Sequence, residues 1–363
     1  MTDLRIQRFN GISPPPPPPP PQGGRFFGDP GVGNIYMGWS APGGRAAEFE
    51  ANDAKLGAPV GIVRLFSPDG RVDWTKVDYH RARGRISALS VKNAGGYGAS
   101  NADLAAMNAT ARAWVDSLAE PMLARPKLPI LFTVHHEPDN DITTSGAAET
   151  FRDAKRQFYH RMRVTNGVDN FVFVDAVWMG GMTFKPNTPR DWRWWSADWK
   201  GTSTGGATWD DPTPVDYYPG PYVDLTHGSV TDVLGIDAYL WWGEAGREGT
   251  PWTSYRTIFG NFVNVIRQVY PTTPIALHEW ACGAYCGDET HTNEVWSTAN
   301  KNQTQNWMRD AYAYMLESNV VSACWFTSFD TVHNLNNFDP NRWRYETLRE
   351  LCTRSTTVLP TVI

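Results

Sequence analysis

Short apolar runs alternate with amphipathic segments eight times after residue 30. This alternation indicates either a closed parallel barrel or a long doubly wound sheet. A Gly-x-Gly-x-x-Gly turn does not follow the first run, which argues against a dinucleotide-binding sheet. We therefore predict an α/β fold: a (β/α)8 TIM barrel with an extended N-terminal polyproline arm. The predicted strands are 34–40, 60–66, 85–92, 130–136, 171–177, 233–239, 275–278 and 321–327.

Helical periodicity fills several of the intervals between these runs, and a chain of 363 residues is long enough for one barrel of this kind. We divide the chain into an N-terminal arm (1–30), a barrel domain (31–354) and a C-terminal tail (355–363). The predicted helices are 44–56, 101–118, 147–164, 258–269 and 301–317.

Residues 14–21 are eight consecutive prolines, which can only form an extended polyproline II rod. This rod is either a stiff spacer or a docking arm that fixes the domain to a larger assembly. We favour attachment, because a free enzyme has little need for a rigid leader.

Composition excludes several classes of partner. The net charge of -5 comes without acidic or basic blocks, so we expect no nucleic-acid partner. No apolar run reaches the roughly 20 residues that span a bilayer, so we expect no membrane insertion. The N-terminus also lacks the apolar core of a secretory signal.

The four cysteines form neither a disulfide framework nor a zinc site. Cys324 and Cys352 are interpreted as ordinary thiols. Cys282 and Cys286 could form a loop disulfide if the protein works in an oxidising space. Aromatic residues are abundant, with 17 Trp, 14 Tyr and 16 Phe. Their faces can stack on sugar rings, although most tryptophans fill cores, so position must decide.

Two glutamates follow apolar runs that read as buried strands. Glu137 ends the fourth predicted strand, and Glu279 ends the seventh. A charge at the edge of a core is costly unless the site uses or solvates it. In a barrel the carboxyl ends of the strands share one face, so both carboxylates would meet in one cleft. Two carboxylates flanking a scissile bond are what glycoside hydrolysis requires.

Three sequence motifs belong together. They are His136-Glu137, Glu279, and Tyr218-Pro219-Gly220 leading through Val223-Asp224 to Gly235-Ile236-Asp237-Ala238-Tyr239. These motifs resemble glycoside hydrolases of clan A, and within the clan family 26, best known for β-mannanases. The resemblance spans most of residues 34–350. It implies that Glu137 is the acid/base, that Glu279 is the nucleophile, and that no cofactor takes part.

The same resemblance implies further site residues. Tyr239 and Arg64 would donate hydrogen bonds to the nucleophile, and His136 would hold sugar hydroxyls or orient the acid/base. Trp325 resembles the clan's floor for the sugar at the cleavage point. Trp178 and Trp39, on the fifth and first strands, are added as substrate-binding candidates.

The remaining histidines are assigned structural roles first. His135 alternates with His136 along the strand, so one of the two faces the barrel and the other packs behind it. We prefer the packing role for His135, and His278 stays ambiguous. A metal site built from His135, His136 and His278 lacks the usual ligand spacing, and we predict none.

About 50 residues separate the fifth strand from the sixth, far more than the usual 2–6. This connection forms either distal sugar-binding subsites or a small cover packed by its own tryptophans. Its tryptophans are Trp192, Trp194, Trp195, Trp199 and Trp209.

The proline-rich leader and the His135-His136-Glu137-Pro138 strand end also resemble glycosidase-like modules in the tails of phages that infect actinobacteria. This second resemblance implies a virion-tail or extracellular location and tail-protein partners bound through the arm. A cytoplasmic location is left open.

We predict a retaining glycoside hydrolase that cleaves internal bonds of a β-linked polysaccharide, either mannan-like or a host cell-envelope glycan. The residues after Glu137 differ from the family pattern, which leaves the sugar open. One alternative is a virion-tail structural module that binds cell-surface glycan with little or no hydrolysis. A metal-dependent hydrolase on the same barrel is a third interpretation.

Overall fold

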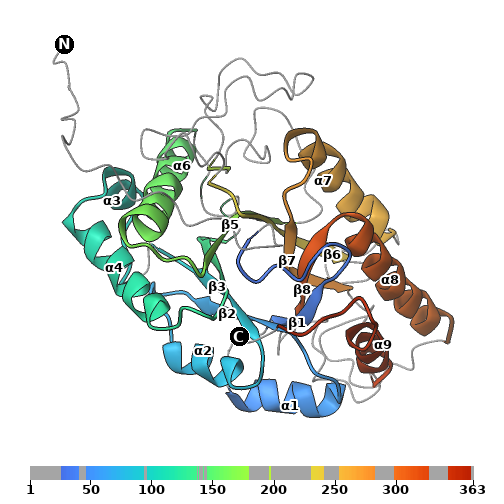
Figure 1. The fold of residues 1–363 in the computed structure, drawn as a ribbon. Helices are drawn as coiled ribbons and strands as arrows, with labels where there is room; N and C mark the ends of the chain where they lie inside the picture. The colour runs from blue at the N-terminus through green and yellow to red at the C-terminus, as the bar shows by residue number, and fades with distance from the viewer. Residues whose placement is uncertain are drawn as a thin grey trace.

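The protein folds as a closed barrel of eight parallel strands, in the order β1 to β8 around the ring (Figure 1). This arrangement confirms the predicted (β/α)8 barrel. The computed structural model describes residues 26–40, 46–93, 96–136, 138, 142, 145–179, 196–197, 230–240, 253–282, 298–326 and 342–360. The octaproline segment lies outside these residues.

Figure 1 shows the helices around the strands, with α3, α4 and α6 on one side and α7, α8 and α9 on the other. The strands are β1 (Tyr36–Ser40), β2 (Ile62–Ser67), β3 (Ile86–Val91), β4 (Ile130–Val134), β5 (Phe171–Met179), β6 (Val233–Leu240), β7 (Ile275–Cys282) and β8 (Val320–Phe326). The helices are α1 (Ala46–Leu56), α2 (Trp74–Arg81), α3 (Asn101–Ala106), α4 (Ala109–Leu123), α6 (Ser145–Tyr159), the π-helix η1 (His160–Thr165), α7 (Tyr255–Val269), α8 (Thr298–Glu317) and α9 (Arg342–Cys352).

The amino-terminal half of the barrel interior is apolar. Each strand contributes its first or second residue to one buried cluster, which excludes water from this end of the barrel. The polar residues of the interior therefore lie nearer the carboxyl ends of the strands. The clustered strand residues are Tyr36, Ile62, Ile86, Leu131, Val172, Val233, Ala276 and Val321.

Residues on both sides of 31–354 contact the barrel. Phe26 packs into the apolar cluster at the amino end of the barrel, and the Tyr36 hydroxyl donates to the carbonyl of Gly28. Toward the other end of the chain, Thr357 forms a parallel bridge with Ile35. Parts of the predicted arm and tail therefore pack on the amino-terminal end of the barrel.

Two helices were missed by the sequence pattern, α2 and α9. The predicted helix 101–118 is broken by Met107, which has a left-handed backbone with φ of 44°. Ser100 begins α3 with a capping box, and Asn108 caps α4 by accepting from the amide of Ala111. Among the described residues, no helix is long and apolar enough to cross a membrane.

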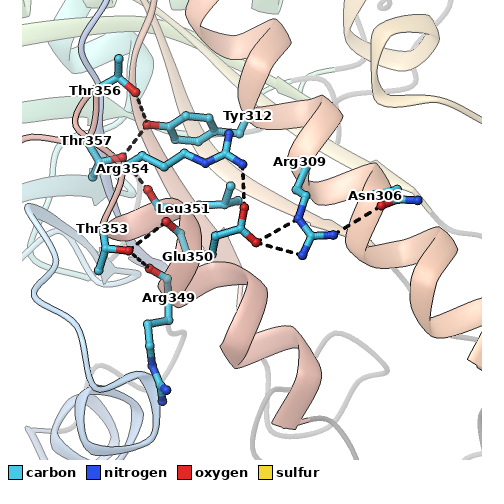
Figure 2. A network of polar contacts seen from close by, with 10 residues as sticks. All are labelled: Asn306, Arg309, Tyr312, Arg349, Glu350, Leu351, Thr353, Arg354, Thr356 and Thr357. Carbon is cyan, nitrogen blue, oxygen red and sulfur yellow. Dashed lines mark hydrogen bonds and ion pairs between the residues drawn. The ribbon is translucent and has the colours of Figure 1, made fainter.

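Helices α8 and α9 are joined by an ion network that also holds the C-terminal segment (Figure 2). Glu350 of α9 accepts from Arg309 of α8 and from Arg354. These two guanidinium groups lower the pKa of the Glu350 carboxyl through hydrogen bonds and charge. Tyr312 of α8 shares hydrogen bonds with the hydroxyls of Thr356 and Thr357.

A buried carboxylate ties the long connection between β5 and β6 to the barrel. Asp175 of β5 forms an ion pair with Lys155 of α6, and both side chains are at most 1% exposed. The same carboxylate accepts from the hydroxyls of Ser196 and Thr231 and from the amide of Ala197. Asp175 therefore binds two points of the connection, one within it and one just before β6.

We expect Asp175→Ala to lower the free energy of unfolding by about 3–5 kcal/mol, because it leaves the buried Lys155 charge without this carboxylate. Urea denaturation of the purified variant measures the change. Glu317→Ala is the control, because it breaks the exposed pair with Arg256 and should cost less than about 1 kcal/mol. Equal losses in the two variants would contradict a stabilising role for the Asp175 network.

His80 of α2 is buried against the ring of Phe49, with a centroid distance of 4.4 Å. Burial, helped by the positive charges of Arg85 and Arg83, lowers the pKa of His80 from 6.5 to about 3. Between pH 6.5 and about pH 3, His80 is therefore protonated more readily in the unfolded chain than in the folded chain. The contribution of neutral His80 to stability is complete above pH 6.5 and is lost as the pH falls toward 3.

We expect His80→Phe to weaken the loss of stability on acidification, because phenylalanine cannot take up the proton that the folded state excludes. Urea unfolding of the wild type and the variant at pH 7, 6, 5 and 4 gives the two slopes. The variant should have the shallower slope, and identical slopes would refute this assignment.

Candidate active site

Arg64 of β2 lies at the centre of a buried charged cluster near the carboxyl ends of the strands. Its Nη1 lies 2.6 Å from Oε1 of Glu279 on β7 and 3.3 Å from Oδ1 of Asp237 on β6. The side chains of Arg64 and Asp237 are 0% exposed, and that of Glu279 is 6% exposed. One guanidinium group is therefore shared by two carboxylates from neighbouring strands.

Glu279 is held at its second oxygen as well. The hydroxyl of Tyr239 on β6 donates to Oε2 of Glu279, so different strands hold the two carboxylate oxygens. The structure places Glu279 inside β7, whereas the sequence predicted it just after a shorter strand. The register between β6 and β7 shifts at this point, with Asp237 opposite Glu279 and His278 skipped. Such bulges re-aim side chains next to functional sites.

Arg64 is fixed by two further contacts. Its Nε donates to the Ser90 hydroxyl of β3 at 3.0 Å. Its guanidinium group lies 4.6 Å from the ring centroid of Phe66, two residues along the same strand. Phe66 in turn contacts the ring of His136 edge-on, at 5.5 Å. This sequence of contacts connects the arginine at Glu279 with the histidine that precedes Glu137 in the chain.

His136, Asp237 and Glu279 each offer a ligand atom within 4.8 Å of the others. A metal ion between them would face Arg64, whose guanidinium group already contacts both carboxylates. The positive charge of this cluster is thus supplied by an arginine, and the donor set does not favour a metal ion.

Two buried groups near the charged cluster, His278 and Cys324, stay neutral. Burial, together with the positive charges of Arg64 and His136, holds the pKa of His278 far below its usual value. Burial raises the pKa of the Cys324 thiol, which stays protonated despite the nearby Arg64. Neither group adds charge to the Arg64 cluster near neutral pH.

Two of the predicted substrate-binding tryptophans point away from this cluster. Trp39 and Trp325 are paired in register on β1 and β8, and both are 0% exposed. Trp325 packs edge-on against Trp280 at 4.7 Å, and Trp39 donates to Asp53 of α1 at 3.3 Å. Both indoles fill the layer between strands and helices, so contact with a ligand is not supported for either.

The structure brings some of the predicted site residues together and separates others from them. Arg64, Tyr239, His136 and Glu279 are brought together. His135 has a left-handed backbone with φ of 56°, and its ring packs on Phe151 of α6 behind the strand.

Glu137 and the tryptophans of the connection between β5 and β6 lie outside the described residues, as does the side chain of Trp178. Their roles stay predictions. Free Cys324 and Cys352 are both buried, as expected of ordinary thiols.

The sequence reading assigned no role to Asp237, Ser90, Phe66 or Phe326. Phe326 is half-buried, and its ring contacts Tyr239 edge-on at 5.8 Å, on the side of β8 opposite Trp325. Asp237 was visible within the Gly235-Ile236-Asp237 motif, and its alternation with Tyr239 signalled that both face the interior. No comparable signal marked Ser90, whose only distinction is its place opposite Arg64's Nε.

A scan against protein-family models found no match, and a search of curated proteins found no relative. Solved structures share the fold at low sequence identity. A modular endo-β-1,4-mannanase of glycoside hydrolase family 26 from Cellulomonas fimi is 16% identical, with a TM-score of 0.53 over 92% of this chain and 73% of that one. The mannanase BCman of Bacillus subtilis is 13% identical, with a TM-score of 0.50 over 91% of this chain and 88% of that one.

The family 5 glycoside hydrolase PbGH5A of Prevotella bryantii B14 is 13% identical, with a TM-score of 0.52 over 88% of this chain and 96% of that one. The chain has the fold of these glycoside hydrolases. At such identities the likeness concerns the fold alone.

We expect Arg64→Met to lower the free energy of unfolding by about 3–5 kcal/mol, because it removes the cation that both buried carboxylates contact. Adding Asp237→Asn to this variant should restore part of the loss by removing one of the two negative charges. Urea denaturation of the wild type, both single variants and the double variant gives the coupling energy. Strict additivity of the two single effects would refute the shared ion pair.

Proposed function

We propose that this protein is a retaining glycoside hydrolase that cleaves internal bonds of a β-linked polysaccharide. The observation that carries the proposal is the environment of Glu279: Arg64 at 2.6 Å from one oxygen and the Tyr239 hydroxyl on the other. A guanidinium group and a hydroxyl donor both favour the ionised carboxylate that a nucleophile needs. The glycoside hydrolase fold of the barrel supports this assignment.

In this mechanism Glu279 attacks the anomeric carbon while Glu137 protonates the leaving oxygen, which gives a covalent glycosyl-enzyme. Glu137 then takes a proton from water, and the water attacks the same carbon and releases Glu279. The bond to the enzyme breaks, and the sugar keeps its original configuration. His136 supports the pairing, since it lies beside Glu279 and directly precedes Glu137 in the chain.

The substrate that we propose first is a β-mannan, because two of the solved structures with this fold are mannanases. The sequence after Glu137 reads Pro138-Asp139-Asn140, which differs from the family 26 pattern. A β-linked glycan of a host cell envelope is therefore the second substrate that we propose to assay.

A glycan-binding module of a virion tail, with little or no hydrolysis, is the alternative from the sequence. The octaproline segment motivates it, together with attachment to tail proteins and a virion-tail or extracellular location. Release of reducing ends separates the two functions. A module of this kind binds a polysaccharide without releasing sugar.

We expect Glu279→Gln to lower the rate of polysaccharide cleavage by several orders of magnitude while glycan binding survives, because the amide keeps the shape of the nucleophile and loses its charge. Reducing-end release from mannans, other β-linked glycans and envelope polysaccharides measures the rate, and affinity electrophoresis measures binding. Glu317→Gln on the exposed face of α8 is the matched control and should stay fully active. Undiminished cleavage by the Glu279 variant would rule out the proposed nucleophile.

A further inference from the structure

Tyr97 is an exposed aromatic residue on the barrel face that carries the candidate active site. Its side chain belongs to the connection between β3 and α3, at the carboxyl end of β3, and is 60% exposed. The guanidinium group of Arg71, from the β2–α2 connection, lies 3.6 Å from the ring centroid. Since Arg71 covers one face of the ring, such an exposure leaves the opposite face to solvent.

The two connections that carry these residues are bonded to each other, and the β2–α2 connection is also bonded to α4. The amide of Tyr97 donates to the carbonyl of Asp69 at 3.0 Å. The indole of Trp114 donates to the carbonyl of Gly70 at 2.8 Å. Gly70 has φ of 84°, and a Cβ on it would lie 2.6 Å from the backbone of Gly98, so only glycine fits. The ring of Tyr97 is therefore presented by a preorganised platform.

A pocket of about 490 Å³ lies beside this platform, within the usual range for ligand sites. Arg71 and Asp69 line it and form an ion pair at 2.7 Å. Lys76 and Asp73 also line it and pair at 3.8 Å. The lining charges thus occur as matched pairs, which suits a neutral polyhydroxylated ligand better than an anion.

The pocket is linked to the catalytic cluster through Phe66. This residue lines the pocket, lies against Arg64 at 4.6 Å, and contacts His136 at 5.5 Å. A polymer chain that places one sugar at Glu279 can therefore extend over the carboxyl ends of β2 and β3 toward Tyr97.

We propose that Tyr97, Arg71 and Asp69 form a binding subsite for a neutral sugar residue of the polysaccharide. The sugar stacks its C–H face on the open face of Tyr97 and shares its hydroxyls with the Asp69–Arg71 pair. This inference rests on the proposed function for the polymeric nature of the ligand. The binding step itself needs no hydrolysis.

The test uses affinity electrophoresis of the full chain carrying Glu279→Gln, with galactomannan, glucomannan, mixed-linkage β-glucan and xylan as probes. For a polysaccharide that retards the Glu279→Gln parent, adding Tyr97→Ala should weaken binding about tenfold, whereas adding Tyr97→Phe should leave the affinity unchanged. Adding Arg71→Ala should also weaken binding, because it removes both a hydroxyl partner and the support of the ring.

Tyr79→Ala is the matched control. Tyr79 lies under Arg83 at the same 3.6 Å, and Arg83 pairs with Glu50. Glu50 and Tyr79 belong to the outer helices α1 and α2, and Arg83 directly follows α2. The control should change the affinity less than twofold. Thermal unfolding verifies that each variant is folded.

Equal binding by the Tyr97→Ala variant and its parent, or no retardation by any of the four polysaccharides, would overturn the subsite. Binding is measured in a variant that carries Glu279→Gln, so the subsite is tested independently of hydrolysis. If the wild type binds these glycans without releasing reducing ends, the proposed hydrolysis is contradicted and the subsite is not.

Discussion

One guanidinium group shared by two buried carboxylates is the interaction on which the site depends. Arg64 enters the barrel from β2, whereas Asp237 and Glu279 come from β6 and β7 on the other part of the ring. Removing these charges from water is costly unless they meet with good geometry. The cluster is therefore satisfied only in the closed barrel, and the same contacts that neutralise the interior also orient Glu279.

The barrel interior has two layers. An apolar cluster packs the amino end, and the charged cluster around Arg64 lies toward the carboxyl end. Residues such as Ile62 and Val233 begin their strands and pack the lower interior. Two residues further on, β2 carries Arg64, and four residues further on, β6 carries Asp237. Strand alternation sends these residues inward, so the charged cluster begins one or two side-chain repeats beyond the packed core.

The barrel was predictable because eight apolar runs of strand length are a local property of the chain. Helix α2 was missed because Trp74–Arg81 is short, rich in charged residues and almost without apolar periodicity. Helix α9 was also missed, although its buried Tyr345, Leu348 and Leu351 have helical spacing that could have predicted it. Glu279 and Tyr239 could be identified from short motifs, but the direction of Trp325 could not. Which side of a strand faces the interior depends on register, and β7 and β8 shift register beside this residue. The contact of Arg64 with Asp237 joins residues 173 positions apart, which no local pattern reports.

The carboxylate of Asp175 fixes two points of the long connection between β5 and β6. It accepts hydrogen bonds from Ser196 and Ala197 within the connection and from Thr231 just before β6, so one buried side chain holds two points of the connection. The entropy of closing a loop grows only slowly with its length. Extra sequence inserted between these two points would therefore cost little closure entropy, and the strands of the barrel would not need to change.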